Sequence, residues 1–116
     1  MKTFDLTRSV LSIALATAAI ALTMPAHAAP DAAAAEALAR QNNCFKCHSV
    51  NKKKDGPSFA ETAAKYKGKP DAEAILSKHL TTAEKAKFPD GHEEEHKVIK
   101  ANEAELKNIV AWILAQ

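Results

Sequence analysis

The sequence contains little of what builds sheets, disulfide frameworks and membrane spans. After residue 28, valine, isoleucine and threonine are sparse and alanine is abundant. No run there alternates apolar and polar residues as a strand does, so an all-helical domain is predicted. The apolar stretch Val10 to Leu22 has 13 residues, short of the ~20 that a membrane span needs. The two cysteines both belong to one short motif, which leaves none for a disulfide framework.

The first 28 residues are typical of an export signal. Lys2 and Arg8 give a short positive segment ahead of the apolar stretch, and Ala26-His27-Ala28 has the small-x-small pattern of a cleavage site. We therefore expect residues 1–28 to be a secretory signal peptide that is cleaved after Ala28. An uncleaved membrane anchor is the alternative. Residues 29–116 then form a single domain of 88 residues.

Methionine is absent from this expected domain, because the chain has only Met1 and Met24. The domain keeps 14 basic and 13 acidic residues, a balance that gives no signature of nucleic-acid binding. A core of this size is only marginally stable unless a disulfide, a metal or a bound group reinforces it. No internal repeat divides the chain.

The string Cys44-Phe45-Lys46-Cys47-His48 is the C-x-x-C-H pattern of covalent haem attachment. The thiols of Cys44 and Cys47 can each form a thioether to one porphyrin, and His48 then supplies an axial nitrogen to the iron. One covalent haem c is therefore expected, and its large apolar surface would stabilise the small core. Such motifs receive their haem outside the cytoplasm, in agreement with the expected signal peptide.

Capping residues and breakers divide the domain into four expected helices. Asp31 can cap a helix that runs to about Gln41, and Asp71 can cap a third helix. A capping box of Ser58 with Glu61 begins the second helix, which runs to about Tyr66. A second capping box, of Asn102 with Glu105, begins the last helix. Residues 81–100 are polar and are expected to be irregular. The expected haem-pocket packing is Phe45, Phe59, Tyr66, Leu76, Leu80, Ile109, Val110 and Ile113.

A second axial ligand is needed if the haem iron only transfers electrons. Methionine sulfur is the common choice in cytochromes c, and the expected domain has none. The histidines available are His79, His92 and His96. An open position and a lysine, Lys97 or Lys100, remain as alternatives.

The chain resembles the short class I cytochromes c of bacteria over essentially all of residues 29–116. The family has a Gly-Pro-x-aromatic segment nine residues after the haem histidine, here Gly56-Pro57-Ser58-Phe59, and a tryptophan in the last helix, here Trp112. The resemblance implies a small all-α fold of four or so helices around one covalent haem, with Phe59 and Trp112 at the haem. It also implies that the Pro57 carbonyl accepts the Nδ1 hydrogen bond of His48.

The same resemblance selects a sixth ligand. The ligand methionine of the family precedes the tryptophan by roughly sixteen residues, and counting back from Trp112 reaches His96. The pair His48 and His96 is therefore the expected metal-binding set, with histidine in place of methionine. The loop before His96 also looks a few residues longer than in the family.

A periplasmic one-electron carrier, and not an enzyme, is the function that these features imply. Its partners would be redox proteins, and the protein would be a monomer or weak dimer. Neither nucleic-acid binding nor stable membrane insertion after signal cleavage is expected. One alternative is a haem protein whose labile distal ligand lets a small molecule such as NO, CO or O₂ bind, as a sensor or weak peroxidase. Another is a haem subunit that works only within an enzyme complex.

Two further strings have competing interpretations. His92-Glu93-Glu94-Glu95-His96 fits the H-E-x-x-H zinc-protease pattern, but it follows a Pro-Asp-Gly turn in a domain too small for a substrate cleft. Lys52-Lys53-Lys54 is interpreted as a solvated loop, with a docking patch for an acidic redox partner as the alternative.

Overall fold

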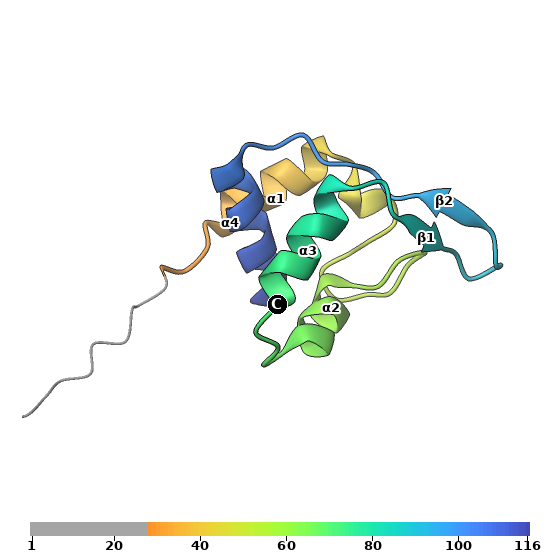
Figure 1. The fold of residues 1–116 in the computed structure, drawn as a ribbon, viewed down its shortest axis with the longest axis horizontal. Coiled ribbons are helices and arrows are strands. Elements are labelled where there is room, and N and C mark those ends of the chain that lie inside the picture. The colour runs from red at the N-terminus through yellow and green to blue at the C-terminus, as the bar shows by residue number, and fades with distance from the viewer. Residues whose placement is uncertain (1–27) are drawn as a thin grey trace, which may run out of the picture.

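The computed structural model describes residues 28–116, and the expected signal peptide lies almost wholly outside them. Within this part, four α-helices surround a common core, and a short β-hairpin projects from the helical body (Figure 1). In chain order the elements are α1 (Ala32–Gln41), the 3₁₀ turn η1 (Cys44–Lys46), α2 (Phe59–Tyr66), α3 (Ala72–Thr81), β1 (Lys85–Lys87), β2 (Glu93–Glu95) and α4 (Glu103–Leu114). The expected all-α fold of four or so helices is confirmed in its four helices.

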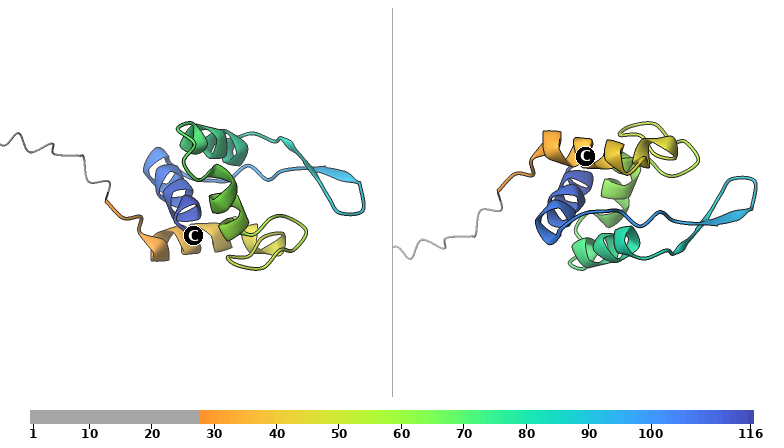
Figure 2. Two further views of the ribbon diagram at one scale, coloured as in Figure 1. Left: turned by 90° about the horizontal axis from the view of Figure 1, so that it is seen from below. Right: turned by 90° about the horizontal axis from the view of Figure 1, so that it is seen from above.

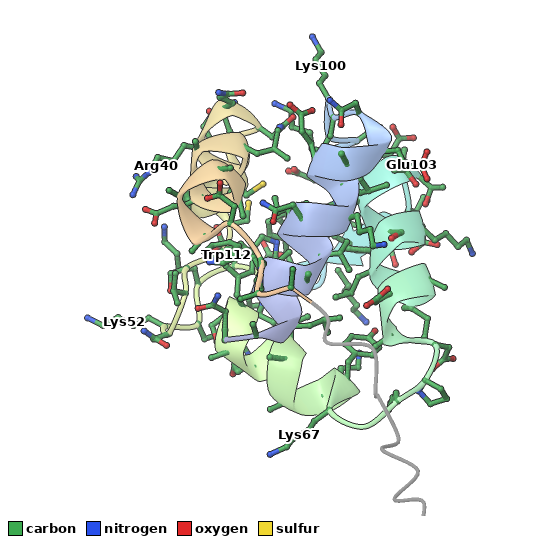
Figure 3. The ribbon with its side chains drawn as sticks, turned by 90° about the vertical axis from the view of Figure 1, so that its left-hand side faces the viewer. Arg40, Lys52, Lys67, Lys100, Glu103 and Trp112 are labelled. Carbon is green, nitrogen blue, oxygen red and sulfur yellow. The ribbon has the colours of Figure 1, made fainter. Side chains whose placement is uncertain are left out.

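Helix α4 is the centre of the packing, because it contacts each of the other three helices. Figure 3 shows it between α1 and α3, with Trp112 directed into the body and Lys52, Lys67 and Lys100 directed away from it. Asn108 on α4 also joins the start of α1: its side-chain oxygen accepts from the Asp31 backbone N–H at 2.8 Å, and its Nδ2 donates to the Asp31 carbonyl at 2.9 Å.

Both predicted capping boxes are present. The Ser58 hydroxyl accepts from the Glu61 backbone N–H at 3.1 Å, and the Glu61 carboxylate accepts from the Ser58 N–H at 2.8 Å. Asn102 and Glu105 form the same reciprocal pair at the start of α4, with both distances 2.9 Å. Asp31 caps α1 as predicted. These caps satisfy backbone donors that a helix start would otherwise leave unpaired.

Asp71 is a correction to the predicted caps. It precedes α3, but its side chain makes no capping hydrogen bond. Its backbone has φ −98° and ψ 4°, whereas a capping residue usually has an extended backbone that aims its side chain at the helix start. The turn before α3 therefore holds Asp71 outside the capping geometry.

The hairpin is a second correction, since residues 81–100 were expected to be irregular. Strands β1 and β2 are antiparallel, and in the register Lys85 faces Glu95, Ala86 faces Glu94 and Lys87 faces Glu93. The strands lack an apolar face, so periodicity gives no signal for them, whereas opposite charges across the pair favour this register. Figure 2 shows the hairpin extending beyond the helices in both views.

The core lies where the four helices meet. Every side chain that the sequence assigned to haem-pocket packing belongs to it: six are buried, while Phe45 and Tyr66 are partly buried against it. Trp112 is 6% exposed and Ile109 is 1% exposed. Cys44 and Phe45 of the C-x-x-C-H motif are partly buried against this core, so the core lies beside the motif.

Candidate haem site

The C-x-x-C-H motif is folded as one tight turn after α1. Asn43 has a left-handed backbone, with φ 59°, which redirects the chain from α1 into η1. The Cys47 and His48 backbone N–H groups both donate to the Cys44 carbonyl, at 3.2 and 2.9 Å. Both thiols are free and half-buried. Burial raises the pKa of the Cys44 thiol above its ordinary value, although nearby Lys97 opposes this shift.

The loop after the motif returns the chain to His48. The Gly56 N–H donates to the Cys47 carbonyl at 2.8 Å, and the Phe59 N–H donates to the Ser49 carbonyl at 2.9 Å. The exposed tip of this loop includes Lys52-Lys53-Lys54, in agreement with a solvated loop. Its two ends are therefore fixed beside His48.

Pro57 and Phe59 both contact the His48 ring. His48 Nδ1 lies 2.6 Å from the Pro57 carbonyl oxygen. A carbonyl can only accept, so Nδ1 carries the proton and Nε2 keeps its lone pair. The Phe59 ring stacks on that of His48 at 5.6 Å between centroids, and Trp112 meets Phe59 edge-on at 5.3 Å. The structure thus places Pro57 and Phe59 against His48, and Trp112 behind Phe59.

Gly56 is a functional position that the sequence reasoning missed. A Cβ added there would lie 2.5 Å from His48 Cε1 and 2.9 Å from His48 Nδ1. Only a residue without a side chain lets the loop approach the imidazole this closely. A glycine next to the proline that binds the histidine was the available signal.

His96, which directly follows β2, faces His48 with 6.2 Å between the two ring centroids. Its Nδ1 is buried and has no hydrogen-bond partner within residues 28–116. Burial lowers the pKa of His96 below its ordinary value, and the neighbouring His79 and His48 lower it further. A neutral imidazole is the form that binds metals.

The backbone holds His96 at the base of the hairpin. The His96 N–H donates to the Glu84 carbonyl at 2.7 Å, and three residues later the Ile99 N–H donates to the Leu80 carbonyl at 2.9 Å. The segment is also tied to α1, since the buried Asn42 accepts from the Lys100 N–H at 2.9 Å. The segment is thus held by the residue before β1, by α3 and by the residue that ends α1.

The other two candidate histidines, His79 and His92, have different surroundings. His92 is at the exposed hairpin tip, where Asp90 and Glu94 contact its two ring nitrogens and Phe88 stacks on it at 4.3 Å. His79 lies near the end of α3, with its ring centroid 4.1 Å from that of His96. This contact was not anticipated from the sequence.

The H-E-x-x-H string does not have the geometry of a zinc site. Its central residues form β2, whereas the zinc-protease motif needs one helix to place both histidines on one face. Within residues 28–116, no three His, Cys, Asp or Glu side chains cluster so as to hold a metal ion.

Comparison with known proteins agrees with this geometry. The family model described as "Cytochrome c" matches residues 32–116. Cytochrome c-552 of Nitrosomonas europaea is 33% identical over 97 residues, which cover 84% of this chain and 88% of that protein. Cytochrome c-552 of Hydrogenobacter thermophilus is 33% identical over 80 residues, covering 69% of this chain and 79% of that protein.

A solved structure extends the similarity. The class 1 cytochrome MtoD from Sideroxydans lithotrophicus is 63% identical, with a TM-score of 0.74 over 75% of this chain and 97% of that one. The chain therefore belongs to the cytochrome c family, whose haem c is covalently attached, and its two cysteines, Cys44 and Cys47, fit that attachment.

Proposed function

We propose that this cytochrome c is a one-electron carrier whose haem iron is held by two histidines, His48 and His96. The observation that carries the proposal is the placement of the two imidazoles, with 6.2 Å between their centroids. When bound, the haem supplies an iron that alternates between ferric and ferrous states. The protein residues hold that iron and shield it from water.

The spacing of the two rings suits one metal between them. An imidazole nitrogen binds a transition metal at about 2 Å, and the ring centre lies roughly 1 Å beyond that nitrogen, so two rings on opposite sides are separated by about 6 Å. The unpartnered, buried Nδ1 of His96 also supports a ligand role, because buried polar atoms seldom lack a partner.

Three neighbouring residues would keep the proximal side in place. The Pro57 carbonyl fixes the tautomer of His48, so Nε2 is left as the ligand atom. Phe59 covers the ring on the core side, and Trp112 packs against Phe59 behind it, which excludes water. Imidazole favours ferrous iron less than a thioether does, so this ligand pair lowers the potential relative to methionine-ligated relatives.

Residues 1–28 are proposed to direct export and to be cleaved after Ala28, so that residues 29–116 act in the periplasm. Within residues 28–116, no helix has the combined length and apolar character needed to cross a bilayer. The carrier would exchange electrons with redox partner proteins as a monomer or weak dimer and catalyse no reaction itself.

The small-molecule-binding alternative is less well supported. It requires the segment that contains His96 to swing away from His48, yet the backbone N–H groups of His96, Ile99 and Lys100 hold that segment in place. Family membership also favours an electron carrier.

Two alanine variants test the ligand assignment. His96→Ala should turn the iron high-spin and open it to carbon monoxide, whereas the matched variant His92→Ala should leave the spectrum nearly unchanged, because His92 is held at the hairpin tip by Asp90 and Glu94. Optical spectra of both oxidation states give the spin state. If His92→Ala and not His96→Ala gives high-spin iron, the proposed ligand is wrong.

A further inference from the structure

His79, Glu84 and His96 form a closed set of contacts at the base of the hairpin. The rings of His79 and His96 lie 4.1 Å apart between centroids, with 43° between their planes. His79 Nδ1 lies 3.4 Å from Glu84 Oε2, and the Glu84 backbone carbonyl accepts from the His96 N–H at 2.7 Å. Glu84 therefore contacts both histidines, one through its side chain and the other through its backbone.

The two kinds of contact restrain different parts of His96. The backbone hydrogen bonds fix its Cα position, but they leave the imidazole free to rotate about its side-chain bonds. The His79 ring, by contrast, contacts the His96 imidazole directly. His79 is only partly exposed, and its position on the rigid helix α3 is fixed by helical hydrogen bonds. A rigid neighbour of this kind restricts the rotamers that His96 can adopt.

We propose that His79 is a positioning residue for the sixth ligand: its ring, oriented by Glu84, holds the His96 imidazole towards His48. The inference rests on the proposed ligand pair and extends it. His79 acts through His96 and does not bind the iron. Its removal should therefore leave the ligand set intact while allowing His96 to leave the iron more often.

Carbon monoxide binding to the ferrous protein measures this directly. In a six-coordinate protein, carbon monoxide can bind only after His96 has left, so the binding rate reports how often the ligand detaches. We expect His79→Ala to raise that rate by about tenfold, corresponding to roughly 1.4 kcal/mol. The ferric electron-paramagnetic-resonance signal should stay low-spin but shift, because it depends on the relative orientation of the two axial rings.

Two further variants separate ring contact from a general effect on α3. His79→Phe keeps an aromatic ring against His96 and loses only the bond to Glu84, so its rate should fall between those of the wild type and His79→Ala. Lys78→Ala removes the neighbouring 3.2 Å ion pair to Glu84 and should leave the rate within about twofold of wild type.

The outcomes distinguish the inference from the proposed function. If the wild type is slow and His96→Ala is fast, but His79→Ala is as slow as the wild type, the positioning role is refuted and the ligand pair stands. A His79→Phe rate equal to that of His79→Ala, or a Lys78→Ala rate as high, would also overturn the ring-contact role. A wild-type protein that binds carbon monoxide as fast as His96→Ala would overturn both claims.

Discussion

Replacing Gly56 by alanine should disturb the proximal histidine more than any ordinary loop substitution. The added Cβ would lie 2.5 Å from His48 Cε1 and 3.2 Å from the Cys47 carbonyl oxygen, where ordinary contact begins at 3.4 Å. The imidazole would therefore have to retreat by about 1 Å, because its ring is rigid and the loop is fixed on both sides.

The cost has two parts. Overpacking of a close contact costs about 1–3 kcal/mol. A retreating His48 ring also stretches its 2.6 Å hydrogen bond to Pro57, which is worth roughly 1 kcal/mol. The sum, about 2–4 kcal/mol, should lower the urea midpoint of unfolding by roughly 1–3 M. The haem spectrum and reduction potential should shift with it, since the strain acts on the ligand.

Gly68→Ala is a matched control for this variant. Gly68 has φ +75° and no heavy atom within 4 Å of an added Cβ, so alanine there meets backbone strain of about 1–2 kcal/mol and no steric clash. It should destabilise the protein while leaving the haem spectrum and potential unchanged. If Gly56→Ala has the wild-type potential and unfolding midpoint, the inferred close approach to His48 is refuted.

The remaining predictions concern the segment that follows Gly56. Pro57→Ala should shift the potential and loosen the pocket while keeping the haem attached, because the carbonyl partner of His48 becomes less well fixed; an unchanged potential and stability would contradict this role. Ser58→Ala should lower the free energy of unfolding by about 1 kcal/mol in urea titrations through loss of the capping box. Hydrogen bonds from the Ser58 backbone and side chain lower the pKa of Glu61 below its ordinary value. The Glu61 contribution is therefore complete above its unfolded-state pKa and is lost as the pH falls through the lowered pKa of the folded state. Glu61→Gln should accordingly make stability less dependent on pH on the acid side, and an unchanged pH profile would count against this capping contribution.

The parts of the fold that local chemistry determines were predictable from the sequence. Capping boxes depend on residues three positions apart, so Ser58 with Glu61 and Asn102 with Glu105 could be found directly. The α4 side chains expected in the haem pocket, Ile109, Val110 and Ile113, are likewise all buried. The position of Pro57 relative to His48 was recognisable from its fixed spacing in the family.

The features that were missed depend on backbone geometry or on contacts distant in sequence. Asp71 has a residue type that caps helices, but its ψ near 0° prevents it from doing so. The hairpin has charged strands, and its stabilising pairs join residues up to ten positions apart, so periodicity could not reveal it. The approach of His79 to His96 follows from that hairpin and could not be inferred without it.

The central claim is tested most directly by the optical spectrum of the exported wild-type protein, ferric and ferrous, with and without carbon monoxide. The proposed ligand pair predicts low-spin spectra in both states, no band near ~695 nm of the kind that methionine ligation gives, and slow, incomplete reaction with carbon monoxide. A high-spin ferrous protein that binds carbon monoxide rapidly would contradict the assignment of His96 as the sixth ligand and favour the small-molecule-binding alternative.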